Sequence, residues 1–311
     1  MKVGNQPFGT APNGTNGILP EKRSFQKSAL GQLLFSLRRN RVGLFGTVIV
    51  FFVLFIAVFG PLVAPHDPLQ HNLRGRFKSP GYTDAKGTFL LGTDQLGRDI
   101  LSRVVAGTRI SVVVGVLSVV IAGVTGVSYG LLSGFAGGVV DNLMMRIADA
   151  FLAIPFIVLV VAVSGVIGAS LVTLIFILGL TSWVTYARVT RAEVLAVREM
   201  DYVMAARALG QSDIKIMFKH ILPNVTGSII VLATMMVATT MLAEAALSFL
   251  GLGVQPPTVT WGLMLSDGRQ YIGSAWWMST FPGIAITITV LGVVFVGDWL
   301  RDLLDPRLRG Q

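Results

Sequence analysis

The chain has 311 residues, of which 53% are hydrophobic and only 13% are charged. Soluble proteins carry about 25% charged residues, so this composition argues against a soluble enzyme. The apolar residues form long uninterrupted blocks, which helices in a bilayer need and a water-soluble core does not. The net charge of +9 does not indicate nucleic-acid binding, because the basic residues are sorted between segments. The chain has no cysteine, which excludes disulfides and thiolate metal sites.

The first apolar block predicts a transmembrane helix over residues 42–64. Between Arg41 and Asp67 lie 25 residues without formal charge, enough to cross the ~30 Å hydrocarbon layer at ~1.5 Å per residue. A signal peptide is disfavoured, because the block is longer than the ~7–15 residues of a signal h-region and follows a polar leader. Within the leader, residues 1–41, we expect disorder over 1–20 and contact with the membrane surface over 21–41.

Further stretches without charge predict five more spans. The fold class is therefore an all-α membrane protein with six transmembrane helices. Pro155 falls inside the third span and is expected to kink it, because proline removes a backbone donor and crowds the preceding turn. The expected limits are 110–133, 148–167, 170–189, 225–248 and 281–300.

The distribution of basic residues predicts the orientation. Six spans place both termini on one side, and that side receives most of the arginines and lysines, so it is the cytoplasm. Three exceptions, Arg98, Arg103 and Arg109, lie on the opposite side. The expected parts are a cytoplasmic leader 1–41, an extracytoplasmic loop 65–109, a five-helix core 110–300 and a cytoplasmic tail 301–311.

The segment 190–223 is patterned where an idle connector would be merely polar. Residues 199–209 contain small, strongly helix-forming alanines, and Gly210 then provides a left-handed turn. After the turn, capped by Ser212 or Asp213, an amphipathic helix is expected to end at Pro223. Two interpretations remain open: a lever at the cytoplasmic mouth, or an interfacial hairpin that seals the bundle. The apolar positions of the second helix are Ile214, Met217, Phe218 and Ile221.

Four motifs carry a resemblance to a known family. Residues 204–210 read MAARALG and are followed by Leu222 and Pro223, which resembles the EAA loop of permease subunits in binding-protein-dependent ABC importers. The stretches LGTDQLGRD (91–99), LSFLGLGVQPP (247–257) and GDWLRDLLDP (297–306) resemble the dipeptide/oligopeptide/nickel permease group. The resemblance runs from about residue 38 to residue 309. Met204 departs from the family's glutamate and His220 from its isoleucine.

The resemblance implies the second (C-type) permease subunit of an importer of peptides or related small solutes, such as nickel chelates, with the type I ABC permease fold, in a bacterial inner membrane. Its implied partners are a homologous permease subunit, two ATP-binding subunits and an extracytoplasmic binding protein. The chain has no phosphate-binding G-x-x-x-x-G-K-[ST] motif. We therefore expect a transport subunit that binds no cofactor, with ATP and magnesium on the partners. The expected coupling contacts are Asp201, Tyr202, Met204, Ala205, Ala206, Arg207, Gly210, Leu222 and Pro223.

Charges near the membrane are candidates for function. Glu244 is the only formal charge between Lys219 and Asp267, and an unpaired ion costs several kcal/mol in hydrocarbon. Counted from the start of its helix, Glu244 lies ~30 Å along, near the outer surface. We expect it to be solvated there, and to anchor a gate or loop rather than to contact substrate. At the cytoplasmic turn, Arg146 and Asp149 are expected to pair on one helix face.

Polar residues of the fourth span leave two alternatives open. Thr181, Thr185 and Tyr186 fall on roughly one side of the helix, where they either line a polar pathway or hydrogen-bond to other helices. His66 and His71 have no spacing that defines a metal site, so no metal is expected. The alternative function is a self-contained secondary transporter, but the sequence has neither the internal repeat nor the mid-bilayer acids typical of that class.

Overall fold

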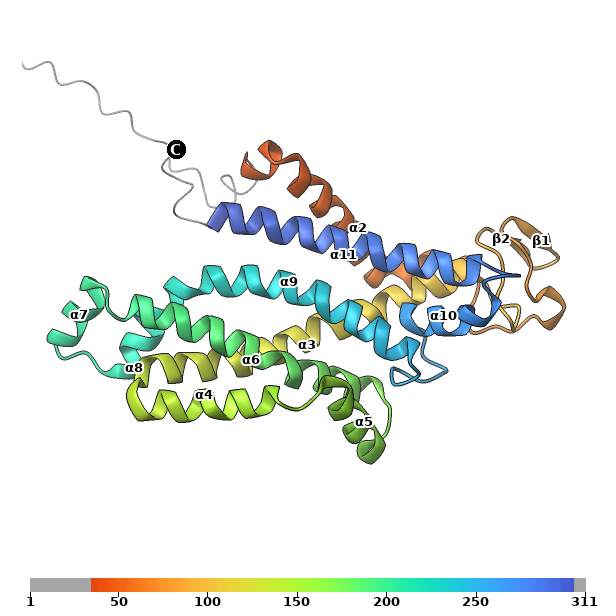
Figure 1. Ribbon diagram of the computed structural model, residues 1–311. Coiled ribbons are helices and arrows are strands. Elements are labelled where there is room, and N and C mark those ends of the chain that lie inside the picture. The colour runs from red at the N-terminus through yellow and green to blue at the C-terminus, as the bar shows by residue number, and fades with distance from the viewer. Residues whose placement is uncertain (1–34, 305–311) are drawn as a thin grey trace, which may run out of the picture.

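The computed structural model describes residues 35–304, and its long helices lie side by side in one bundle (Figure 1). The predictions for residues 1–34 and 305–311 lie outside this range. The long helices are α2 (Arg41–Val63), α3 (Ile100–Ala136), α4 (Gly138–Leu152), α5 (Phe156–Ile167), α6 (Leu171–Val197), α9 (Leu222–Phe249) and α11 (Trp277–Leu304).

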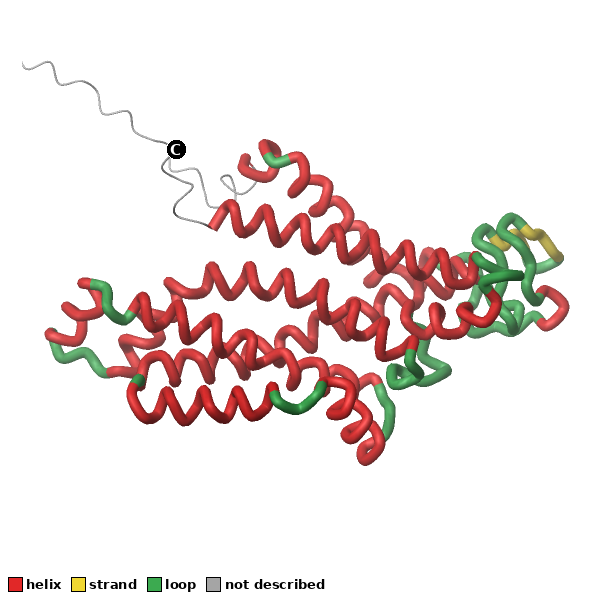
Figure 2. The backbone as a smooth tube through the Cα atoms, in the orientation of Figure 1, coloured by secondary structure: helices red, strands yellow, loops and turns green. Residues whose placement is uncertain are grey.

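Short elements occupy the two ends of the bundle (Figure 2). One end carries α7 (Asp201–Ala208), α8 (Asp213–Ile216) and the π-helical turn η2 (Met217–Ile221). The other end carries the 3₁₀ turn η1 (Leu73–Gly75), the antiparallel pair β1 (Tyr82–Asp84) and β2 (Gly87–Phe89), then α10 (Trp261–Gly268) and the 3₁₀ turn η3 (Arg269–Tyr271). We call them the α7–α8 end and the hairpin end.

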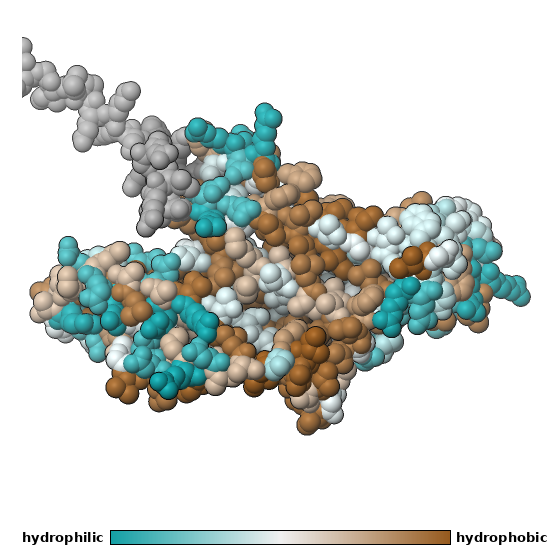
Figure 3. Space-filling view, viewed as in Figure 1, coloured by the Kyte–Doolittle hydropathy of each residue, from teal (hydrophilic) through white to brown (hydrophobic). Residues whose placement is uncertain are grey.

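The bundle has the length and polarity of a membrane protein. Within residues 35–304, five helices are long and apolar enough to cross a bilayer, and the bent pair α4 and α5 can form a sixth span. Figure 3 shows apolar side chains around the middle of the bundle and polar side chains gathered at its two ends. The prediction of an all-α membrane fold is confirmed.

Helix α3 begins at Ile100, not at residue 110. Asp99 caps it by accepting a hydrogen bond from the backbone N–H of Ser102 at 3.0 Å. The helix has 37 residues, hence a length of about 55 Å, well beyond the ~30 Å of hydrocarbon. Residues 100–109 were expected in the loop 65–109, but they are helical. A stretch without charged residues predicts only the part of a helix that lies in hydrocarbon, so it does not show where the helix begins.

The third span is broken, not kinked. Helix α4 ends at Leu152, α5 begins at Phe156, and their axes differ by 79°. Pro155 has an extended backbone with ψ at 129°, and the residue before a proline is itself disfavoured in helical geometry. The expected single helix over 148–167 is wrong, because Pro155 stops the helix and turns the chain.

Glycines bring α3 and α6 into close contact. A Cβ atom on Gly126 or Gly130 would overlap the backbone carbonyl oxygens of Trp183 and Ala187, and one on Gly134 would lie 2.9 Å from the Cβ of Val194. In a bilayer, helices gain little from apolar contact alone, so close backbone packing through small residues holds them together. The glycine repeat thus fixes α6 against α3 over about two turns.

The described ends of the chain lie at the same end of the bundle. Helices α2 and α11 are antiparallel, since Gly43 packs on Trp299 and Gly46 on Phe295. Leu304 lies near Gly227, at the start of α9 and so at the α7–α8 end. An even number of spans gives this arrangement.

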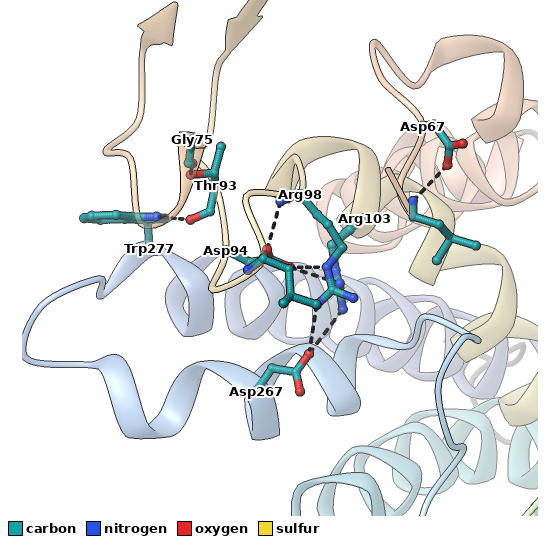
Figure 4. A network of polar contacts seen from close by, with 10 residues as sticks. Asp67, Gly75, Thr93, Asp94, Arg98, Arg103, Asp267 and Trp277 are labelled. Atoms are coloured by element: carbon teal, nitrogen blue, oxygen red, sulfur yellow. Dashed lines mark hydrogen bonds and ion pairs between the residues drawn. The ribbon is translucent and has the colours of Figure 1, made fainter. Parts of the chain in front are cut away.

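Buried charges tie the long loop at the hairpin end to the bundle (Figure 4). The Asp94 carboxylate pairs with Arg98 Nε at 2.6 Å and with Arg103 Nη1 at 3.0 Å, and Arg103 Nη2 lies 3.3 Å from Asp267 of α10. Asp94 and Arg103 are each 2% exposed. Trp277 Nε1 of α11 also donates to the Thr93 carbonyl at 3.0 Å. Two of the three exceptions to the charge rule, Arg98 and Arg103, are thus paired.

This network predicts a large loss of stability when one partner is removed. Asp94→Ala leaves the buried guanidinium of Arg103 with Asp267 alone and should lower the free energy of unfolding by about 3–5 kcal/mol. The matched control is Asp149→Ala, which breaks an exposed pair with Arg188 and should cost less than about 1 kcal/mol. Thermal unfolding of the purified protein measures both, and equal losses would contradict the prediction.

Candidate functional site

The segment at the α7–α8 end has the expected helix, glycine and helix. Helix α7 ends at Ala208, and Gly210 adopts φ of +76° before α8 begins at Asp213. A Cβ atom on Gly210 would meet nothing within 4 Å. Glycine is therefore required by its backbone conformation and not by lack of space.

A buried cluster braces this segment against the bundle. Val203 and Ala206 of α7 pack with residues of α8, η2, α3 and α6. Of the predicted coupling residues, Ala206 thus belongs to the core and Leu222 is half-buried, while the others are exposed. The cluster comprises Leu131, Val194, Val197, Val203, Ala206, Ile216, Met217, Ile221 and Val225.

The predicted apolar face of the second helix is wrong at two positions. Ile214 and Phe218 are 68% and 59% exposed, while Ile216 is buried in the cluster. A π-helical turn follows α8, in which the Leu222 N–H bonds to the Met217 carbonyl, so residues on the two sides of the turn do not share one 3.6-residue repeat. Nor does Pro223 end the helix, because it lies in the first turn of α9, where a missing N–H is tolerated.

Large apolar side chains are exposed at the α7–α8 end, outside the expected spans. Leu209, beside the turn, is 81% exposed. Arg207 lies over the Phe135 ring, 5.6 Å from its centroid. Exposed apolar surface of this kind marks a contact with another protein or a membrane. The exposed side chains are Met200, Tyr202, Met204, Leu209, Ile214 and Phe218.

An ion pair joins α4 to α6, and a hydrogen bond joins α3 to the end of α6, next to this segment. Arg191 of α6 binds the Asp141 carboxylate through Nε at 2.5 Å and Nη2 at 2.6 Å. Arg198, at the end of α6, donates to the Gly134 carbonyl of α3 at 2.8 Å. The expected pair of Arg146 with Asp149 is not formed, since Asp149 binds Arg188 of the facing helix α6.

A cavity of about 410 Å³ opens between α4, α5, α6 and α9, beside the break at Pro155. Thr181 and Thr185 line it, as does Ser182. Tyr186 does not: it is fully buried against Val119 and Ala122. Its hydroxyl has no hydrogen-bond partner among the described residues. The structure therefore separates Tyr186 from the two threonines.

Glu244 is buried at the hairpin end and not solvated. It is 1% exposed, and Ser248 Oγ donates to its carboxylate at 2.8 Å. The hydroxyls of Ser111 and Thr260 also hydrogen-bond to it. Thr260 caps α10, so this one carboxylate joins α3, α9 and α10. The expected solvation is wrong, and the contacts support the preferred role as a loop anchor.

Comparison with known proteins places the chain in a family. The profile of the binding-protein-dependent transport system inner membrane component matches residues 126–310, and that of the N-terminal TM domain of oligopeptide transport permease C matches residues 28–80. This chain belongs to the family of binding-protein-dependent transport system inner membrane components. It is a permease subunit and not an enzyme, and in such importers separate subunits hydrolyse ATP.

Individual relatives cover nearly the whole permease. It is 41% identical over 283 residues to the di/tripeptide transport system permease protein DppC of Pseudomonas aeruginosa (strain UCBPP-PA14), covering 91% of this chain and 93% of the relative. The oligopeptide transport system permease protein OppC of Bacillus subtilis (strain 168) is 40% identical over 88% of each chain. An inward-facing structure of the MetNI methionine ABC transporter matches with a TM-score of 0.55 at 21% identity, over 66% of this chain and 98% of that one. This match confirms the type I permease fold.

Sequence reasoning missed several residues of the permease's candidate site. Ser182, Thr239 and Thr240 line the cavity with the two predicted threonines. They lie on two helices, so only tertiary packing brings them together. Leu209, Ile214 and Phe218 were missed as a surface, because periodicity assigned two of them to the core. The bond from Thr260 to Glu244 spans a loop that carries no regular pattern.

The Glu244 contacts predict different effects for two substitutions. Glu244→Leu removes the acceptor of three buried hydroxyls. Each hydroxyl left without a partner should lower the free energy of unfolding by about 1–3 kcal/mol. Glu244→Gln keeps an acceptor oxygen and should preserve most of the stability. Thermal unfolding of the purified permease compares them, and an equally large loss in both variants would contradict this account.

Proposed function

We propose that this permease is the C-type subunit of an ATP-driven importer of peptides. It acts with a homologous permease subunit, two ATP-binding subunits and an extracytoplasmic binding protein. The relatives named above, DppC of a di/tripeptide system and OppC of an oligopeptide system, support the cargo, since they match at about 40% identity over most of their length.

In this proposal the segment 198–221 is the docking element for an ATP-binding subunit. One observation carries this proposal: the segment is fixed to the bundle on one side and exposes apolar side chains on the other. Val203 and Ala206 are buried against the bundle, while side chains such as Leu209 are exposed. A partner groove would cover that surface. The contacts are the predicted residues that remain exposed, together with Leu209, Ile214 and Phe218. Ala206 and Leu222 position them.

The proposed docking element faces the cytoplasm, where ATP is available. The start of α2 and the end of α11 lie at the same end of the bundle, so both termini are cytoplasmic in this proposal. The loop 64–99 and α10 then face the binding protein's compartment.

Helix α6 connects the docking element with the cavity. It runs from the cavity wall at Thr181 and Thr185 to Val197 at the base of the segment, a distance of ~18 Å from Thr185. The bonds of Arg191 to Asp141 and of Arg198 to Gly134 make α3, α4 and α6 one body. Movement of the docked segment therefore tilts the cavity wall, while the break at Pro155 lets α5 move separately.

The cavity suits peptides of varied sequence. Its lining combines hydroxyls with apolar side chains and contains no charged residue. The Thr181 hydroxyl is already committed to the carbonyl of Ile177 at 2.9 Å, so the wall offers few strong contacts. Such a wall lets peptides pass, and recognition falls to the binding protein.

The turn at Gly210 predicts loss of coupling on substitution. Gly210→Val forces a β-branched residue to positive φ, a strain of about 1–3 kcal/mol that should reduce uptake and stimulated ATPase activity by about tenfold. Gly210→Asn should retain more activity, since asparagine tolerates this conformation. The matched control is Gly168→Val: Gly168 also has positive φ and open space, but lies between α5 and α6. Uptake in reconstituted vesicles measures the effect. Similar losses of uptake at both glycines would contradict a specific coupling role of the turn at Gly210.

The cavity predicts a contrast between neighbouring residues. Thr185→Trp fills part of the proposed pathway with a large side chain and should lower peptide uptake by about tenfold, a barrier increase on the order of 1.4 kcal/mol. Tyr186→Phe removes a hydroxyl that has no hydrogen-bond partner among residues 35–304 and should leave uptake unchanged. Co-purification of the ATP-binding subunit should be normal in both. If the Thr185 variant transports at the wild-type rate, the cavity is not the pathway.

A further inference from the structure

Helix α2 touches the rest of the bundle closely at its two ends. Near its start, Gly43 and Gly46 lie against Trp299 and Phe295 of α11, where an added Cβ would come within 2.6 Å. Near its end, Gly60 lies against Val105 of α3, where a Cβ would come within 3.0 Å. The helix thus crosses from one neighbour to another.

Between these contacts Ile49 and Val53 of α2 pack on a buried cluster of the bundle, and beside them a cleft of about 210 Å³ remains. Val50, Val53 and Leu54 form its α2 side, and apolar residues of α3, α9 and α11 together with two threonines form the rest. The two hydroxyls present are committed to their own helices: Thr234 donates to the Val231 carbonyl at 2.7 Å and Thr289 to the Ala285 carbonyl at 2.8 Å. The cleft therefore offers no free polar group.

Such a cleft excludes water and accepts hydrocarbon. A buried water needs two to four polar partners, and an apolar cavity of ~150 Å³ stays dry and binds benzene. This cleft is larger, and Leu54 of α2 and Val116 of α3 at its rim are both exposed. In a membrane protein, the medium at such a rim is lipid acyl chains.

A basic hollow lies at the start of the same helix. Ser36, Arg39, Asn40 and Arg41 line it, and its volume is about 510 Å³. Neither arginine forms an ion pair with a carboxylate among residues 35–304. From Arg41 to Val50 the helix rises ~14 Å, which is close to half of the ~30 Å hydrocarbon layer.

We propose that a phospholipid with an anionic headgroup binds along α2. Its phosphate lies on Arg39 and Arg41, and one acyl chain fills the cleft beside Val50 and Leu54. The spacing of hollow and cleft matches the distance from headgroup to bilayer centre, and two cations select a lipid with net negative charge. The lipid adds apolar contacts to those that Ile49 and Val53 already make, so it fastens α2 to the five-helix core.

The test counts lipids on the full-length permease in its complex. The complex is delipidated in detergent, transferred to nanodiscs of phosphatidylglycerol or phosphatidylcholine, released and weighed by native mass spectrometry. We expect the wild-type complex to retain phosphatidylglycerol on this subunit and to lose phosphatidylcholine. Arg39→Gln with Arg41→Gln should remove the preference.

Two variants test the cleft itself. Leu54→Trp at the exposed rim and Val53→Phe inside the cleft should each lower the retained phosphatidylglycerol by about tenfold, because they take the volume of the acyl chain. The control is Leu62→Trp, the same substitution at an exposed position of α2 outside the cleft. Undiminished retention in both cleft variants would overturn the acyl-chain site, and equal retention of the two lipids would overturn the headgroup site. Peptide uptake is not a readout, so failure of the proposed cargo leaves this test intact.

Discussion

The close contact of α3 with α6 is the constraint on which the rest of the permease depends. Gly126, Gly130 and Gly134 let the two backbones approach until any side chain would collide. Because helices in lipid have no hydrophobic drive to associate, this packing replaces a soluble core. Helix α3 also carries Arg103 of the buried ion network and Ser111 beside Glu244, while α6 carries the cavity threonines. A shift between the two helices would thus disturb both ends of the bundle.

The sequence predicted the spans well and their internal geometry poorly, for physical reasons. Uninterrupted apolar residues locate a helix in hydrocarbon, so residues 42–64 and 225–248 agree closely with α2 and α9. Charge says nothing about helix outside the hydrocarbon, so the start of α3 was missed. The effect of Pro155 depends on whether neighbouring helices satisfy the freed carbonyls, and the structure resolves that choice in favour of a break.

The candidate site was predicted in outline but not in its faces. The turn at Gly210 was predicted correctly because a positive φ favours glycine, and this preference does not depend on the spacing of apolar residues. The prediction of the second helix was wrong because a regular 3.6-residue repeat does not hold across the π turn at Met217–Ile221. Ile216 is buried there, and Ile214 and Phe218 lie on the surface. The prediction that Glu244 is solvated was wrong for another reason. Its distance along α9 was right, but its solvation depends on α10 folding back over it, which no local pattern specifies.

The two ends of the permease differ in which side chains they bury. This difference agrees with the proposed function, in which the ATP-binding subunits act at one end only. At the hairpin end, Asp94, Arg103 and Glu244 are buried and satisfied by partners within the chain, so that end is complete and stiff. At the α7–α8 end, side chains such as Leu209 and Phe218 are exposed, and they form the surface proposed above for docking. In the proposed function, force applied there meets a braced segment, passes along α6 and reaches the cavity beside Pro155. There the backbone is already interrupted, and α5 can change its angle without breaking a helix.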